Sequence, residues 1–254
     1  MIKGIIFDYG GTIDSRGVHW SEVIWQGYVD AKMDVSKEEF RQSYVFAERA
    51  LAKHPYIQPE HNFLDLLTIK CDLETQDLVN RGVWLVSDTE RKIQSDAVAN
   101  YCYQYVLNVL EVSRPVIATL AEKYPLVLVS NFYGNVDAVL RGMDIRQYFA
   151  GIIESAVVGI RKPDARIYAL GVMALPVTEQ ARTAGDTCDI FGHGSGAWLR
   201  PESVLVVGDS LSKDIYPARS IGCRTAWIKG RGWTAAEDEA SDPAFIPSLS
   251  ALMP

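Results

Sequence analysis

Short apolar runs recur along the chain, and stretches of helical spacing separate most of them. The runs are rich in β-branched and aliphatic residues and comprise residues 3–7, 126–129, 151–154, 204–207 and 224–228. Such runs are typical of strands that are buried on both faces of a sheet. The intervening helical patterns cover residues 113–123, 136–142, 165–174 and 215–221. Strands that alternate with helices predict an α/β fold with a Rossmann-like, doubly wound parallel sheet.

The stretch between the first two apolar runs has a different pattern, without β-branched runs and with repeated helical spacing. Phe40, Tyr44, Ala47 and Leu51 form one apolar stripe. A second stripe comprises Ile93, Ala97, Tyr101 and Tyr105, flanked by Val98 and Cys102. Stripes at this spacing are typical of the packing faces of amphipathic helices. We therefore expect residues 16–112 to form an all-helical insert in an α/β core of residues 1–15 and 113–254.

Two further features bear on the organisation of the core. Ser113 is a suitable N-cap, and Pro115 fits the first turn of a helix, so a new helix is expected to begin here. Residues 176–201 contain a glycine-rich stretch and predict an irregular excursion before the next strand. Its part from Cys188 to Trp198 is compatible with a flap or with a dimer contact, and the sequence leaves the oligomeric state open.

Composition narrows the class of protein. The chain has 254 residues, 48% of them hydrophobic and 22% charged, which is typical of a globular protein and excludes a disordered chain. Its formal charge is −7 and it has no basic run, so nucleic acid is not an expected partner. The N-terminal apolar run is too short to cross a membrane. Four scattered cysteines (Cys71, Cys102, Cys188 and Cys223) fit free thiols in a cytoplasmic protein.

Reactive side chains follow four of the predicted strands. Asp8 follows the first strand, Ser130 and Asn131 follow the second, and Asp209 follows the fourth. Lys162 lies in a turn after the third strand. In an open parallel sheet, ligands bind outside the carboxyl ends of the strands. The sequence therefore predicts a site where these five side chains meet.

Four motifs resemble those of the haloacid dehalogenase-like (HAD) superfamily, in the same order and with fitting separations. They are Phe7-Asp8-Tyr9-Gly10-Gly11-Thr12, Val129-Ser130-Asn131, Lys162-Pro163, and Gly208-Asp209 followed by Asp214. The helical insert after the first motif resembles the C1-type cap of that superfamily. The resemblance implies a Mg²⁺-dependent hydrolase, in most members a phosphatase that acts on a small phosphorylated metabolite.

The resemblance also implies roles for individual residues. Asp8 would be the nucleophile that forms an aspartyl-phosphate, and Lys162 would stabilise the phosphoryl charge. Asp8, Asp209 and the carbonyl of Gly10 would hold Mg²⁺, with Asp214 as a further ligand or an anchor. The residues implied in binding the phosphate are Ser130, Asn131, Gly11 and Thr12.

One position departs from the family pattern. HAD phosphatases usually carry a second Asp two residues after the nucleophile, where this chain has Gly10. That Asp protonates the leaving oxygen, a contribution typically worth about 10²–10⁴-fold. Its loss predicts a slow phosphatase, or one for good leaving groups such as acyl or aryl phosphates. Asp14 and His19 are the candidates for a substitute acid.

Other hypotheses remain open at this stage. A haloacid dehalogenase also lacks the second Asp, but retention of Asp209 and Asp214 argues against it. A phosphonate C–P hydrolase would need a lysine of the cap to form a Schiff base, and five are available: Lys32, Lys37, Lys53, Lys70 and Lys92. A non-catalytic module that binds phosphate and metal is the last alternative. Candidate substrate contacts in the cap are His19, Trp20, Trp25, Tyr28, Arg49 and His54.

Overall fold

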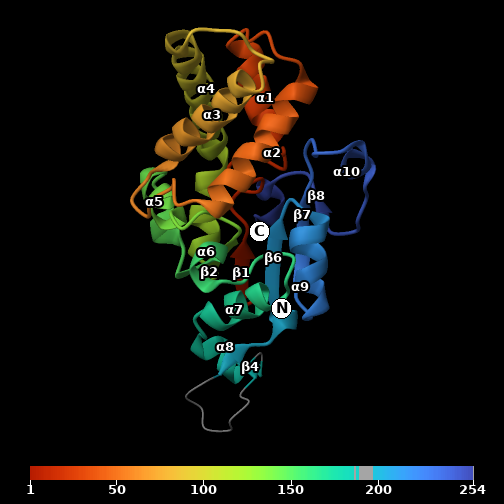
Figure 1. Ribbon diagram of the computed structural model, residues 1–254. Coiled ribbons are helices and arrows are strands. Elements are labelled where there is room, and N and C mark those ends of the chain that lie inside the picture. Colours follow the sequence, from red (N-terminus) through yellow and green to blue (C-terminus); the bar gives the residue numbers. More distant parts are fainter. Residues whose placement is uncertain (186, 189–196, 254) are drawn as a thin grey trace.

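The computed structural model describes residues 1–185, 187–188 and 197–253, and its centre is a six-stranded parallel sheet (Figure 1). The strands are β1 (Gly4–Phe7), β2 (Leu126–Ser130), β3 (Gly151–Glu154), β6 (Val204–Gly208), β7 (Arg224–Ile228) and β8 (Phe245–Ile246). Their order is β3-β2-β1-β6-β7-β8, so the chain winds outward from β1 in both directions. This confirms the doubly wound α/β fold. β8 was not predicted, because two residues are too few to show a period.

Neighbouring residues of a strand point to opposite sides of the sheet, and helices cover both sides. Ile6 and Val206 pack with α7 (Arg166–Ala174) and α9 (Tyr216–Ser220) on one face. Ile5 and Phe7 belong to a cluster on the other face, with α5 (Val136–Gly142) and the end of α4 (Asp88–Ala121). Burial on both faces requires apolar residues at consecutive strand positions, and for this reason the apolar runs in the sequence predict these strands.

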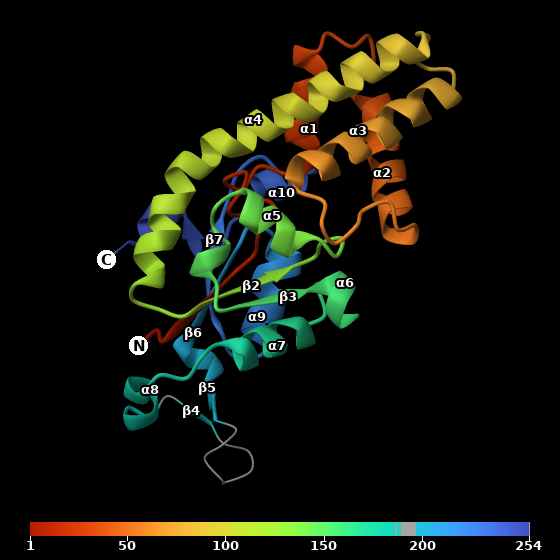
Figure 2. The same ribbon diagram turned by 90° about the vertical axis from the view of Figure 1, so that its left-hand side faces the viewer.

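Three helices of the insert group with the N-terminal part of α4 beyond one end of the sheet (Figure 2). They are α1 (Trp20–Asp30), α2 (Lys37–Lys53) and α3 (Phe63–Asn80). Capping boxes built on Ser36 and Asn62 begin α2 and α3 and satisfy backbone donors at these ends. The predicted stripe of α2 is confirmed, because all four of its residues are buried.

The prediction that a helix starts at Ser113 is wrong, because Ser113 and Pro115 lie inside the continuous, 34-residue α4. A proline inside a helix removes one backbone hydrogen bond, at a cost of about 3 kcal/mol. Buried side chains on both sides of it, Leu110 before and Ile117 after, hold the helix together. A cap residue and a proline in the sequence carry no information about this tertiary packing.

The second predicted stripe is also wrong in part, because Ile93 is 64% exposed and Ala97 faces solvent as well. The buried face of α4 instead carries Arg91, Ser95 and Val98. Arg91 is buried because its guanidinium pairs with Asp72 on α3 at 2.8 Å. Because the packing face includes polar residues, it differs from the stripe of apolar residues in the sequence. A search for apolar residues alone does not find this face.

α4 connects the insert to the core. Buried apolar side chains between Val98 and Leu120, among them Cys102, Leu110 and Ile117, belong to one apolar cluster that includes both the helical insert and one face of the sheet. Figure 2 shows α4 as a single long diagonal helix that runs from the insert to the side of the sheet. Shared burial along this helix makes the insert and that face of the sheet one hydrophobic unit.

The remaining elements are short. They are the 3-10 turns Arg146–Tyr148, Pro201–Ser203 and Leu249–Leu252, the π-helical turn η3 (Leu211–Ile215), the helices α6 (Ser155–Val158), α8 (Glu179–Thr183) and α10 (Ala235–Glu239), and the strands β4 (Thr187–Cys188) and β5 (Trp198–Leu199). Antiparallel pairing of β4 with β5 closes the base of the predicted excursion. Residues 189–196 of that excursion lie outside the described residues. The helix predicted over 215–221 is α9, which follows η3.

Two simpler expectations concern cysteine and membranes. All four cysteines are free, and Cys71, Cys102 and Cys223 are buried. In the part of the chain that the structure describes, no helix combines the length and apolar character needed to cross a bilayer.

Candidate active site

The carboxyl ends of the central strands open into a cavity of about 640 Å³, which the helical insert covers. Asp8 directly follows β1, Ser130 ends β2 and Asp209 directly follows β6. All three line the cavity, as do Asn131 and Lys162. The strand-end residues singled out in the sequence therefore meet in one place, as the parallel topology requires.

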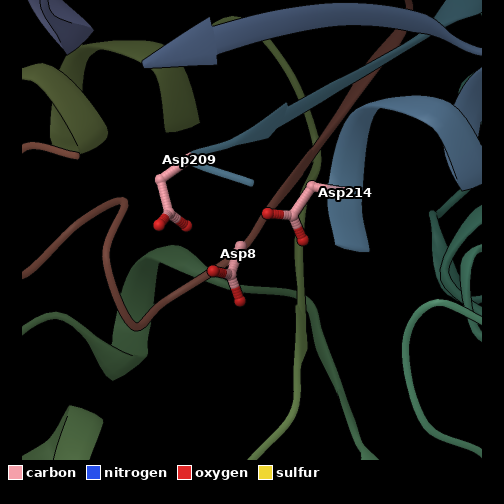
Figure 3. A group of neighbouring side chains, drawn as sticks. All are labelled: Asp8, Asp209 and Asp214. Carbon is pink, nitrogen blue, oxygen red and sulfur yellow. The ribbon is translucent and has the colours of Figure 1, made fainter. Parts of the chain in front are cut away.

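Three carboxylates gather at the floor of this cavity (Figure 3). One oxygen each of Asp8, Asp209 and Asp214 lies within 4.8 Å of the others. Two glycines make this approach possible. A Cβ on Gly208 would stand 2.4 Å from the Cβ of Asp214, and one on Gly11 would stand 2.3 Å from the Asp209 carboxylate.

Lys162 is fixed between two of these carboxylates. Its ammonium donates to Oδ1 of Asp8 at 2.6 Å and to Oδ1 of Asp214 at 2.8 Å. Tyr168 donates its hydroxyl proton to the same Asp214 oxygen at 2.7 Å, and the Ser210 N–H donates to the other at 2.9 Å. Both Asp214 oxygens are thus engaged in holding Lys162 and the loop after β6.

The charges at the floor do not balance. Three carboxylates face one buried ammonium, and Asp209 has no ion pair among the described residues. Burial lowers the pKa of Lys162, but the charges of Asp214 and Asp8 outweigh it and raise that pKa to about 12. Loss of hydration and then the negative charges of Asp214 and Asp8 raise the pKa of Asp209 well above its usual range.

This donor set fits a divalent cation. Three carboxylates share one ammonium, and the side-chain atoms that converge are carboxylate oxygens. Oxygen ligands and one or two carboxylates are what Mg²⁺ prefers. Thr12 lies beneath, with its hydroxyl 3.4 Å from Oδ2 of Asp8 and 3.2 Å from Oδ1 of Asp209, and keeps the two carboxylates close.

The other residues predicted to bind phosphate have unequal positions. Ser130 is buried at the cavity, and its hydroxyl has no hydrogen-bond partner among the described residues, so it is available to a ligand. Asn131 instead braces the lysine loop, because its amide exchanges two hydrogen bonds with the backbone of Lys162 at 2.9 and 3.2 Å. The N–H of Gly11 donates to Asp14 at 2.7 Å and is occupied.

Space for an acid exists at Gly10. A Cβ added there would meet only Trp20, whose Cδ1 and Nε1 would be 3.9 Å away. Gly10 therefore leaves room that the indole ring of Trp20 borders, and no carboxylate occupies it.

The two substitute acids predicted from the sequence are placed differently. Asp14 is buried, and its oxygens accept from the Gly11 N–H and from the indole N–H of Trp20 at 3.0 Å. Burial raises the pKa of Asp14 to about 8, but Asp14 is absent from the described residues that line the cavity. His19 does line it. Its Nδ1 accepts from the Ser21 N–H as the N-cap of α1, and burial, together with nearby Lys213, lowers its pKa to about 4.

The upper wall of the cavity consists mainly of residues that the sequence did not single out as ligand contacts. Five of its aromatic members come from three helices of the insert and from the loops after β2 and β7, and they are Trp20, Tyr44, Phe63, Phe132 and Trp233. Only Trp20 was a predicted contact. Phe132 and Trp233 follow strand ends, so the same strand-end rule applied to aromatic residues would have found them.

One ion pair also lies in the upper wall. Lys70 on α3 pairs with Glu48 on α2, and Tyr133 donates its hydroxyl proton to Glu48 at 3.0 Å. The Lys70 ammonium lies 4.3 Å from the centre of the Tyr44 ring. Burial lowers the pKa of Lys70, but the Glu48 carboxylate outweighs it and raises that pKa well above its usual range.

Lys70 lines the cavity, unlike the other four lysines considered for a Schiff base, which are absent from its described lining. Trp25, Tyr28, Arg49 and His54, which were candidate substrate contacts, are also absent from that lining. Trp25 packs against Phe40, and Tyr28 donates its hydroxyl proton to buried Glu74 at 3.3 Å.

The fold and this arrangement agree with the comparison to known families. The chain belongs to the haloacid dehalogenase-like hydrolases, because the model of that family matches residues 2–222.

Curated relatives match smaller parts of the chain. Haloacid dehalogenase-like hydrolase domain-containing protein 3 of Bos taurus is 27% identical over 131 residues, which is 51% of this chain and 43% of that protein. Phosphoserine phosphatase of Thermus thermophilus is 29% identical over 110 residues, 43% of this chain and 35% of that protein. The chain thus spans less than half the length of these relatives.

Solved structures resemble the whole chain. The HAD hydrolase YfnB of Bacillus subtilis, solved bound to magnesium, has a TM-score of 0.57 at 16% identity, with 99% of this chain and 96% of that chain covered. The L-2-haloacid dehalogenase PA0810 has a TM-score of 0.53 at 16% identity, with 99% and 97% covered. At such identities the likeness shows the fold alone, and that fold is common to both proteins.

Proposed function

We propose that this protein is a Mg²⁺-dependent phosphatase that hydrolyses a small phosphorylated metabolite in the cytoplasm through an aspartyl-phosphate on Asp8. The observation that carries the proposal is the contact of the Asp8 carboxylate with the Lys162 ammonium, at 2.6 Å inside a cluster of three carboxylates. The names of two curated relatives, a phosphoserine phosphatase and a glyceraldehyde 3-phosphate phosphatase, support the reaction class.

The first step forms a bond between an Asp8 oxygen and phosphorus, while the bond from phosphorus to the leaving oxygen breaks. The leaving group departs with that electron pair. Lys162 faces Asp8 and balances the negative charge that collects on the phosphoryl oxygens. Ser130, which lines the cavity, would donate its hydroxyl proton to one of those oxygens. In the second step water attacks phosphorus, and inorganic phosphate and free Asp8 result.

Mg²⁺ would be held by Asp8, Asp209 and the carbonyl of Gly10, and when bound it supplies positive charge that offsets the repulsion between carboxylate and phosphate. Asp214 has a different part, because both of its oxygens are used by Lys162, Tyr168 and Ser210. It orients Lys162 toward Asp8. Thr12 and Asn131 likewise position their neighbours, Thr12 the carboxylates and Asn131 the loop that carries Lys162.

The leaving oxygen receives no proton from a side chain at the usual place, since position 10 is glycine. Asp14 lies outside the described lining of the cavity and accepts the indole N–H of Trp20, and His19 has a pKa of about 4 and carries no acidic proton near neutrality. These positions support good leaving groups as the substrates, because a stable leaving anion needs no acid.

Two alternatives lose support. A Schiff base needs a neutral amine, whereas the pKa of Lys70 is raised by Glu48. A haloacid dehalogenase has no use for the cluster of Asp8, Asp209 and Asp214 as a metal site. The non-catalytic binding module differs from our proposal in turnover, which the following experiment measures.

The test is Mg²⁺-dependent phosphate release from acetyl phosphate, p-nitrophenyl phosphate and glycerol 3-phosphate. We expect turnover of the first two, and a loss of at least about 10³-fold in Asp8→Asn, because an amide is not a nucleophile here. Asp96→Asn is the matched control, since Asp96 is a partly exposed carboxylate on α4 that pairs with Lys92. Absence of turnover with all three substrates, or full activity in Asp8→Asn, contradicts the proposal.

A further inference from the structure

Aromatic rings border the space above the floor on several sides. We call Trp20, Tyr44, Phe63, Phe132 and Trp233 the aromatic wall, and all five line the cavity. Trp20 and Phe63 meet edge to face with ring centres 5.3 Å apart, and Tyr44 and Trp233 lie 5.5 Å apart. The wall combines helices of the insert with loops of the core, so a ligand in the cavity contacts rings from both parts.

The ring of Trp20 stands beside the reacting end of the cavity. A Cβ at Gly10 would be 3.9 Å from both Cδ1 and Nε1 of this indole. Gly10 is two residues after Asp8, so the indole borders the space beside the floor carboxylates where a leaving group must lie. An apolar, polarisable surface is therefore found where a proton donor would be needed for a basic leaving oxygen.

Trp20 is also held in a fixed orientation. Its indole N–H donates to Asp14 at 3.0 Å, and Phe63 packs against its ring. Asp14 is not part of the described lining of the cavity, and both of its oxygens accept hydrogen bonds, one of them from Trp20. A ring fixed before binding loses little conformational entropy when a ligand stacks on it.

Size and shape point the same way. A cavity of about 640 Å³ is in the range of pockets for drug-sized ligands, about 300–1,000 Å³. A ring seated against aromatic side chains gains contact energy beyond that of its buried area. A small acyl group such as acetate has no surface for these contacts.

We propose that the substrates are phosphomonoesters of aromatic hydroxyls, with the aromatic ring of the leaving group seated against Trp20 and Trp233. This inference rests on the phosphatase function proposed above and names its substrate class. When Asp8 bonds to phosphorus, the bond from phosphorus to the aryl oxygen breaks, and the aryloxide leaves with the electron pair. The ring delocalises that charge, and the aryloxide takes its proton from water after departure.

The test compares two stable probes that share the phosphonate group, phenylphosphonate and methylphosphonate. Their dissociation constants are measured by calorimetry with the full chain in Mg²⁺. We expect phenylphosphonate to bind at least about tenfold more tightly, which corresponds to about 1.4 kcal/mol. In Trp20→Leu and Trp233→Leu this preference falls to about threefold or less, while methylphosphonate binding changes by less than about twofold.

Trp25→Leu is the matched control and keeps the full preference, because Trp25 is on the same helix but outside the described lining of the cavity. Trp20→Leu removes a hydrogen bond to buried Asp14, so thermal unfolding checks its fold. The indole N–H of Trp233 has no hydrogen-bond partner among the described residues. Trp233→Leu therefore removes no such bond and keeps the test decisive if Trp20→Leu does not fold.

Equal binding of the two probes by the unmodified protein overturns the inference, and so does an unchanged preference in both wall variants. These results are independent of turnover. Phosphate release with a failed preference would leave the phosphatase function intact and remove the aromatic substrate class. A preserved preference without any phosphate release would instead remove the phosphatase function and leave a site that binds aryl phosphates.

Discussion

The floor and the upper wall of the cavity are built on different principles. At the floor, Asp8, Lys162 and Asp214 come from strand ends and adjoining turns, and hydrogen bonds of 2.6 to 2.8 Å hold them together. At the upper wall, Trp20 and Trp233 come from a helix of the insert and a loop of the core, and ring packing holds them. At the floor, hydrogen bonds constrain the positions of the polar atoms, whereas the wall provides an apolar contact surface of a given shape.

The difference separates chemistry from selection. A change at the floor alters the charge that faces the phosphoryl group, which every substrate carries. A change in the wall alters contacts that only some leaving groups make. Floor variants should therefore lower kcat for all substrates, and wall variants should change the ranking of ligands.

The largest effect is expected at Lys162. Lys162→Met removes the positive charge beside Asp8, and kcat should fall about 10²–10³-fold with acetyl phosphate and p-nitrophenyl phosphate alike. Because Lys162 lowers the pKa of Asp8 against the effect of burial, its loss raises that pKa, so the remaining activity should need a higher pH. Steady-state kinetics from pH 5 to pH 9 measure both effects.

Lys92→Met is the control for this variant, because Lys92 is a half-exposed lysine on α4. A fall in kcat with only one of the two substrates would mean that Lys162 selects substrates as the wall residues do. That result would contradict the distinction between floor and wall.

The next effect is a gain at Gly10. Gly10→Asp places a carboxyl group beside the leaving oxygen, where the nearest atoms to its Cβ are 3.9 Å away. Hydrolysis of glycerol 3-phosphate should rise about 10²-fold, because an alkyl leaving group needs a proton, while p-nitrophenyl phosphate should change little. Measurement of kcat/KM for both substrates gives the answer.

Gly10→Asn separates proton transfer from shape, since Asn fills the same space and has no acidic proton. An equal rise in Gly10→Asn would attribute the gain to packing against Trp20. No rise in either variant would mean that the wall, and not the missing acid, excludes alkyl phosphates.

The last effect is on stability and concerns the helical insert behind the wall. Burial raises the pKa of Glu74 to about 8, and its Oε1 has no partner among the described residues. The folded state thus binds this proton more tightly than the unfolded state, so its contribution to stability is complete below about pH 4.5 and is lost as the pH rises to about 8.

Glu74→Gln should therefore gain stability relative to the unmodified protein between those pH values, by at most about 1.4 kcal/mol per pH unit. Urea unfolding at pH 5, 6.5 and 8 measures the difference. Glu111→Gln, an exposed position on α4, should show no such trend. A constant difference for Glu74→Gln across these pH values would contradict the raised pKa.

Local patterns predicted the sheet well and the long helix poorly. Five of the six strands of the sheet were found because burial on both faces leaves continuous apolar runs. At Ser113 and Pro115 a cap and a proline resemble a helix start, but packing of Leu110 and Ile117 keeps α4 continuous. At Ile93 the apolar residue faces solvent, because Arg91 takes the buried face by pairing with Asp72.

The floor could be predicted from the sequence, because its reactive residues follow strands and parallel strands bring their carboxyl ends to one edge. Asp8, Asp209 and Lys162 were predicted on that ground, and they line one cavity. The tertiary structure alone decided that Trp20 borders the space at Gly10, that Lys70 pairs with Glu48, and that Trp233 completes the wall. These contacts depend on how helices and loops distant in sequence pack together, and no local spacing encodes that geometry.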